Sequence, residues 1–122
     1  MEATRKVLIV DKSIDRKKRI AAVKNRGFAV FPALRLAEAR SRCRPGVYDL
    51  VIVNAQDEPE AALAFCDSLR DRTPAQPVLL IASEDANVER EYVVAEDPEL
   101  LAGRVESALR QSNADNAGRA VA

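Results

Sequence analysis

The stretch Lys6-Val7-Leu8-Ile9-Val10 is the strongest indication of how this chain folds. Its four consecutive aliphatic residues are typical of a short strand that is buried on both faces of a sheet. Similar apolar runs return along the chain, at residues 28–31, 48–53, 78–82 and 92–95. The sequence therefore predicts a sheet of five short strands.

Helical patterns separate the predicted strands. They run from Ser13, as a helix cap, to Gly27, from Leu34 to Arg44, from Pro59 to Leu69, and from Pro98 to about Gln111. Strands that alternate with helices favour an α/β fold with a parallel sheet and right-handed crossovers. For five strands we expect the flavodoxin-like, doubly wound order 2-1-3-4-5.

Two details of this architecture are also predicted. Only about nine residues connect Ser83 to Tyr92, fewer than a parallel crossover usually needs, so the fourth helix of such a fold should be shortened or missing. The 122 residues suffice for one domain with one core, which we assign to residues 1–111. Residues 112–122 are small and polar, and we expect a disordered tail or linker there.

The composition excludes several classes of function. The chain has no His, which removes imidazole acid–base chemistry and His metal sites. Its longest aliphatic run has four residues, so we expect no membrane span and no signal peptide. Cys43 and Cys66 form no CxxC motif, and we interpret them as reduced core residues of a cytosolic protein. We expect neither an enzyme nor a cofactor.

Four segments carry a family resemblance. KVLIVD (residues 6–11), YDLVIVN (48–54), PVLLIAS (77–83) and YVVAEDP (92–98) resemble the strand motifs of response-regulator receiver domains. The resemblance extends over nearly the whole chain, from residue 5 to residue 111. It implies the CheY-like form of the flavodoxin-like fold and a role in bacterial two-component signalling.

The same resemblance implies that the phosphorylation chemistry is lost. Receivers bind a divalent cation with two adjacent acids, phosphorylate an Asp after the third strand, and use a Thr or Ser and a Lys that precedes Pro. The corresponding positions here are Asp11, Lys12, Asn54, Ala82 with Ser83 one residue out of register, and Asp97. An amide is not a nucleophile, and a lysine cannot replace a metal-binding acid. The chain therefore resembles a degenerate receiver, or pseudo-receiver.

Two side chains near this pocket have alternative interpretations. The Lys12 ammonium could replace the metal ion by pairing with Asp11, Asp97 or Glu96, or it could point into solvent. Asp57 could serve as a displaced phosphoacceptor, or as a weak metal ligand together with Asp11. The alternative is a solvated acid near the positive N-terminus of the next helix. No ligand spacing indicates a dedicated metal site.

The zero net charge hides a separation of charge. The chain has 19 Lys and Arg and 19 Asp and Glu, but residues 1–46 hold 13 cations and 4 acids (+9), and residues 47–122 hold 6 and 15 (−9). In the predicted sheet the two halves should lie on opposite sides. The candidate partner-binding residues lie on the first helix: Arg16, Lys17, Lys18, Arg19, Lys24 and Arg26.

Three interpretations of this basic helix compete. It can be a solvated face, a surface for a protein with an acidic surface, or one end of a head-to-tail self-association. Nucleic-acid binding is a further alternative, although interleaved aromatic residues are absent from the helix. The sequence thus predicts a non-phosphorylatable pseudo-receiver that acts by protein–protein interaction in the bacterial cytoplasm. The main alternative is a divergent phosphoacceptor that uses Asp57 or a rebuilt metal site.

Overall fold

Five parallel strands form one sheet in the order β2-β1-β3-β4-β5, as predicted. The structure is a computed structural model, which describes residues 4–56, 58–83 and 92–121. The strands are β1 (Lys6–Val10), β2 (Ala29–Ala33), β3 (Leu50–Asn54), β4 (Val78–Ile81) and β5 (Val93–Val94). The flavodoxin-like fold class is therefore confirmed.

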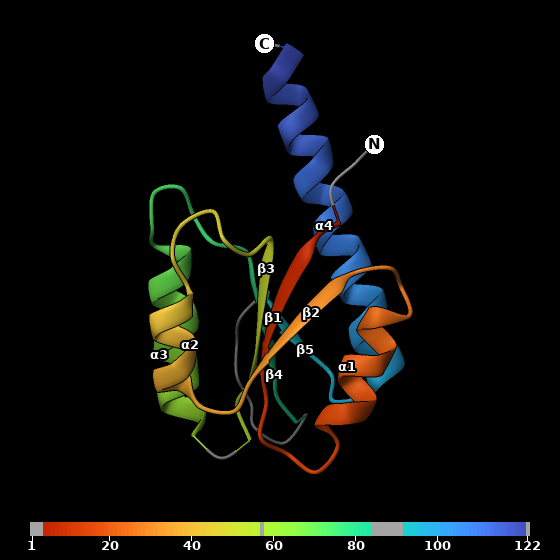
Figure 1. Cartoon of the computed structure of the whole chain (residues 1–122). Coiled ribbons are helices and arrows are strands. Elements are labelled where there is room, and N and C mark those ends of the chain that lie inside the picture. Colours follow the sequence, from red (N-terminus) through yellow and green to blue (C-terminus); the bar gives the residue numbers. More distant parts are fainter. Residues whose placement is uncertain (1–3, 57, 84–91, 122) are drawn as a thin grey trace.

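Helices cover both faces of the sheet (Figure 1). They are α1 (Arg16–Lys24), α2 (Leu36–Arg42), α3 (Pro59–Arg70) and α4 (Pro98–Val121). Figure 1 shows α1 and α4 together on one side and α2 and α3 on the other. The loops that follow β1 and β2 lie at one edge, and the start of β1 and the end of α4 lie toward the opposite edge. The carboxyl edge of the sheet is therefore where the loop residues meet.

The central strands explain why the apolar runs predict the fold so well. β1 pairs with β3 in the register Leu8↔Val51 and Ile9↔Ile52, and these side chains are almost completely buried. Helices on both faces leave no solvated side, so the strand sequences cannot alternate between apolar and polar residues. β2 lies at the edge of the sheet and continues through Pro32 to Ala33, beyond the apolar run at residues 28–31. An edge strand tolerates a residue without an N–H because one side of it has no partner.

Two predicted helix boundaries are wrong. The first helix begins at Arg16, and Ser13 does not cap it, because the Ser13 hydroxyl accepts a hydrogen bond from Arg19 instead. The last helix does not end near Gln111 but continues to Val121, so the expected disordered tail is helical up to that residue. Residues 111–121 contain no proline, and the single Gly118 costs a helix only about 1 kcal/mol relative to Ala.

One expectation lies outside the described residues. The shortened or missing fourth helix falls on residues 84–91, which the structure does not describe. Within the described chain, no helix combines the length and apolar character needed to cross a membrane.

Both cysteines lie in the core as free thiols, as predicted. Burial raises the pKa of the Cys43 thiol, although the nearby Arg72 opposes this shift. Burial raises the pKa of the Cys66 thiol to about 12, and the negative charges of Asp67 and Cys43 add to the effect. The thiolate, which is the reactive form, is therefore scarce at neutral pH.

We predict that neither thiol of the folded protein reacts with Ellman's reagent at pH 8. With a pKa of about 12, only about one Cys66 in ten thousand is a thiolate at that pH, and both groups are shielded from solvent. Absorbance should show two thiols only after the chain is unfolded in guanidinium chloride. Rapid labelling without denaturant would contradict the buried placement.

Candidate functional site

Asp11, at the end of β1, is the centre of a hydrogen-bonded group at the carboxyl edge of the sheet. Its side chain is buried, with only 3% of the residue exposed. The Oδ1 atom accepts hydrogen bonds from the Ser13 N–H at 2.9 Å and from Asn54 Nδ2 at 3.1 Å. The Oδ2 atom accepts one from Arg19 Nη1 at 2.8 Å. Three donors thus replace the water that a carboxylate loses on burial.

Arg19 supplies the positive charge for this carboxylate. It lies on the face of α1 that packs inward, next to Ala22 and Val23, and is only 3% exposed. Its Nη1 also donates to Ser13 Oγ at 2.8 Å, and its Nε donates to the backbone carbonyl of Glu96 at 3.0 Å. The guanidinium thereby connects the end of β1 with the loop that precedes α4.

A buried ion pair is stable only when both charges are fully hydrogen-bonded. Here the carboxylate accepts three hydrogen bonds and the guanidinium donates three, and no buried side-chain polar atom of the described residues lacks a partner. Arg19 suits this role because its rigid fork offers donors in several directions, whereas a lysine would offer a point charge. Removing either partner would leave the other as an uncompensated buried charge.

The location of Arg19 corrects two interpretations of the sequence. Arg19 was expected on a partner-binding surface, but its burial removes it from that surface. Lys12 was considered as a cation that pairs with Asp11, Asp97 or Glu96; of these three pairings, the one with Asp11 is wrong, because Arg19 holds this position. Lys12 is exposed and has an interaction of its own. The helical spacing of Arg19 with the buried Ala22 and Val23 is the signal that would have identified it.

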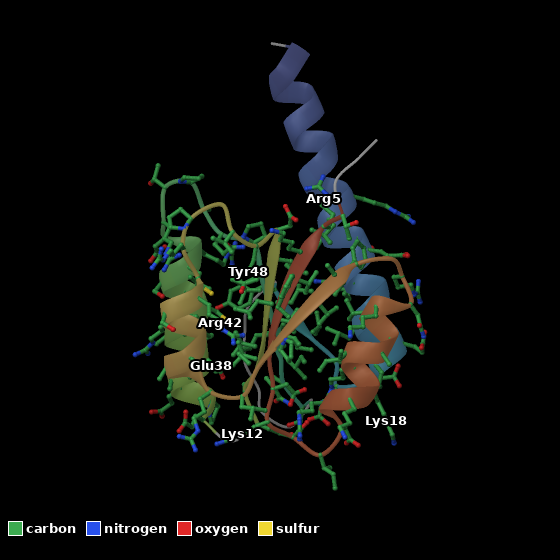
Figure 2. All side chains as sticks on the ribbon, in the orientation of Figure 1. Arg5, Lys12, Lys18, Glu38, Arg42 and Tyr48 are labelled. Carbon is green, nitrogen blue, oxygen red and sulfur yellow. The ribbon has the colours of Figure 1, made fainter. Side chains whose placement is uncertain are left out.

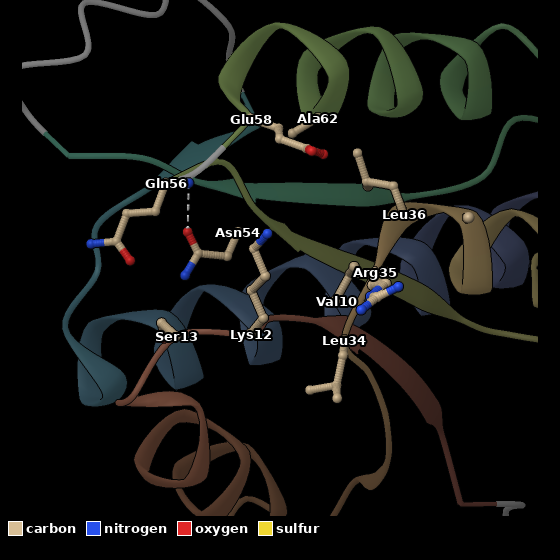
Figure 3. Close-up of a pocket in the computed structure, with 11 residues that line it drawn as sticks. Val10, Lys12, Ser13, Leu34, Arg35, Leu36, Asn54, Gln56, Glu58 and Ala62 are labelled. Carbon is tan, nitrogen blue, oxygen red and sulfur yellow. Dashed lines mark hydrogen bonds between the residues drawn. The ribbon is translucent and has the colours of Figure 1, made fainter.

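Asn54, at the end of β3, uses both ends of its amide. Nδ2 donates to Asp11, and Oδ1 accepts a hydrogen bond from the Gln56 N–H at 2.9 Å (Figure 3). A carboxylate at this position would place a second negative charge against Asp11 and would lose the donor. The amide therefore fits the group that Asp11 and Arg19 form, and it is not a nucleophile.

The other predicted pocket positions do not join this group. Ala82 is buried, and its N–H donates to the Val94 carbonyl at 3.2 Å. Ser83 is exposed. The Asp97 carboxylate accepts a hydrogen bond from the Leu100 N–H at 2.9 Å and thereby caps α4. Asp57 lies outside the described residues.

A divalent cation does not fit the described arrangement. Mg²⁺ is bound through carboxylate oxygens, but both oxygens of Asp11 already accept hydrogen bonds, one of them from a cation. Lys12 brings a further positive charge to the same loop. Among the described residues, no group of three potential ligands could hold a metal ion.

The remaining cations of α1 divide into two sets. Lys17, Lys18 and Lys24 are exposed, and Figure 2 shows Lys18 directed away from the sheet. Arg26, which follows α1 and is also exposed, pairs with Glu106 at 3.2 Å and with Glu99 at 3.4 Å, both on α4.

Arg16 is half-buried, and its Nη1 donates to the Ser13 carbonyl at 3.1 Å. Because α1 packs against α4, part of the basic half meets part of the acidic half inside one molecule. The basic and acidic halves are therefore not separated on opposite sides of the sheet as completely as the sequence predicted.

The strand order and the helices on both faces are those of the CheY-like, flavodoxin-like fold. No family model and no curated protein sequence matches the chain. Among solved structures, it is similar to a response regulator from Thermotoga maritima, with a TM-score of 0.70 and 22% identity over 88% of this chain and 99% of that one. The chemotaxis response regulator CheY4 of Vibrio cholerae gives 0.68 and 19%, over 87% and 99% of the two chains. At these identities the likeness establishes the fold.

A longer protein matches more of this chain. NtrX from Brucella abortus has a TM-score of 0.77 at 18% identity, over 98% of this chain and 29% of its own. With 98% covered, most of the extended part of α4 must be included in the match. The shorter regulators leave more than a tenth of this chain unmatched.

We predict that Arg19→Met lowers the free energy of unfolding by about 3–5 kcal/mol, because it leaves Asp11 buried without a counter-charge. Lys18→Met is the matched control, since Lys18 is exposed on the same helix, and it should change stability by less than about 0.5 kcal/mol. Urea unfolding followed by circular dichroism measures both.

The double variant Asp11→Asn with Arg19→Met gives an independent check. Removing both charges should cost less than the sum of the two single changes, so the double-mutant cycle should give a coupling energy above about 1 kcal/mol. Simple additivity would show that the two groups do not interact in solution.

Proposed function

We propose that residues 1–111 form a pseudo-receiver, a module of bacterial signal transduction that acts in the cytoplasm by binding another protein. The observation that carries the proposal is the buried pair of Asp11 and Arg19, which neutralises the acid that a receiver would use for a metal ion. The receiver-type fold supports the assignment to signalling.

The chemistry of phosphoryl transfer explains why the pocket should be inactive. A phosphoaspartate adds about −1.5 to −2 charges, which need a metal ion and a nearby cation to be stable. In this chain the acceptor position is an amide, and the guanidinium of Arg19 is committed to Asp11, Ser13 and the Glu96 carbonyl. Moving the guanidinium away from Asp11 would leave the buried carboxylate without a counter-charge.

The same contacts imply a single conformation. Arg19 joins the loop after β1 to the loop before α4, and both contacts are made by one side chain. A ligand shifts a conformational equilibrium only when it binds two states differently. With the polar centre already paired, we expect a docking module that is constitutively competent.

The exposed part of α1 supports recognition of an acidic partner. Lys17, Lys18 and Lys24 lie on the helix, Ile14 in the loop before it is 93% exposed, and Leu100 at the start of α4 is 62% exposed. Exposed cations together with exposed apolar side chains fit an acidic, amphipathic surface, and the contribution of the charges should decrease with salt.

The first test of this proposal is a titration with beryllofluoride and Mg²⁺, monitored by amide NMR. We expect no saturable shifts in the loops that follow β1 and β3, in the wild type and in Asn54→Asp alike, because Arg19 remains on Asp11. Saturable shifts clustered around Asp11 and Asn54, or around Asp57, would instead support a divergent phosphoacceptor.

The second test concerns the partner surface. Lys17→Glu should reduce capture of a protein partner from a lysate of the source organism, whereas Arg44→Glu, the same change at an exposed site after α2, should not. Equal capture by both variants would contradict the assignment to α1. Salt-dependent binding of duplex DNA that is lost in Lys17→Glu would support the nucleic-acid alternative.

A further inference from the structure

A cleft of about 410 Å³ opens at the carboxyl edge of the sheet, between the beginnings of α2 and α3 (Figure 3). Three segments line it: the end of β1 with its following loop, the loop into α2, and the loop into α3. Pockets for small ligands commonly have volumes of about 300–1,000 Å³. Asp11 and Arg19 are not among the lining residues, but Ser13 and Asn54, which donate hydrogen bonds to Asp11, are, so the cleft borders the buried ion pair.

Part of the cleft wall is apolar. Val10 and Ala62 are buried and lie at the cleft, while Leu34 and Leu36 line it from the segment that enters α2. Leu34 is 50% exposed, an unfavourable position for a large apolar side chain unless another apolar surface covers it. This wall favours a ligand with an apolar body.

The cleft also carries positive charge from two different loops. Arg35 follows Leu34, and Lys12 follows β1. Among the described residues, the Arg35 guanidinium makes no hydrogen bond, ion pair or ring contact, so its donors are available. Lys12 already has an interaction of its own and contributes its charge. Glu58 is the single acid among the described lining residues.

We infer that this cleft binds a small organic anion. Its carboxylate or phosphate group pairs with Arg35, and its apolar body packs against the apolar part of the wall, to which Leu34 and Leu36 belong. A guanidinium binds such groups through two parallel hydrogen bonds, which a single surface lysine cannot provide. Glu58 favours a ligand with one anionic group over a ligand with several.

This site goes beyond the proposed function and does not depend on it. A bound anion would give the domain a chemical input at the edge of the sheet where it has no phosphoacceptor. The ligand contacts would involve Arg35 and Leu34, neither of which belongs to the group around Asp11.

Phenylphosphonate in the absence of metal is a suitable probe, because its phosphorus cannot be transferred. Amide NMR should show saturable shifts at residues 34–37 and 54–56. Methylphosphonate has the anionic group without the ring and benzyl alcohol the ring without the charge, and each should bind at least about tenfold more weakly. Equal binding of methylphosphonate would overturn the apolar half of the inference, and an absence of saturable shifts would overturn the site.

Arg35→Gln should weaken phenylphosphonate about tenfold, the loss expected for one charged hydrogen-bonding group. Arg44→Gln is the matched control, since it removes the same charge from an exposed arginine outside the cleft, and it should change affinity less than twofold. Equal weakening by both variants would show that the anion responds only to net charge. The beryllofluoride titration tests the pseudo-receiver proposal, and its outcome does not depend on whether phenylphosphonate binds to the cleft.

Discussion

The ion pair between Asp11 and Arg19 is the interaction on which the carboxyl edge of this sheet depends. An isolated carboxylate in the core would be costly, and so would an isolated guanidinium. Together they are satisfied, because Ser13 and Asn54 donate to the carboxylate and the Glu96 carbonyl accepts from the guanidinium. These three groups come from the loop after β1, the end of β3 and the loop before α4, so the ion pair holds three segments together.

In the function that we propose, this arrangement lets a CheY-like fold exist without phosphorylation chemistry. The fold brings loop residues together at one edge, whatever those residues are. Here they form a neutral, internally paired group instead of an acidic pocket that needs a metal ion. The two surfaces that we propose for function are the exposed part of α1 and the cleft beside Arg35. Recognition at either surface requires no reaction at Asn54.

The sequence predicted the sheet because its central strands have almost no freedom in composition. Val7 to Val10 and Leu50 to Val53 are buried on both faces, so the apolar runs mark them directly. Element ends were harder to predict, because they depend on neighbours. Pro32 remains in β2 only because that strand is at the edge, and α4 passes Gln111 because nothing there stops it.

The sequence identified Asp11 and Asn54 as residues of the candidate site, but it assigned Arg19 the wrong role. Asp11 and Asn54 follow strands, and their proximity was predictable from the strand order alone. Arg19 was grouped with its charged neighbours because the helix was treated as one basic run. Only its spacing with Ala22 and Val23 distinguishes a buried arginine from an exposed one, and its partner Asp11 is known only once the helix is packed on the sheet.

The central claim is that the Arg19 guanidinium holds the position a metal ion would need at Asp11. A crystal structure of the protein grown with Mn²⁺, with anomalous scattering recorded, tests this claim most directly. Our account predicts no anomalous peak at Asp11 and a guanidinium within hydrogen-bond distance of its Oδ2 atom. A manganese ion coordinated by Asp11, with Arg19 displaced into solvent, would contradict it.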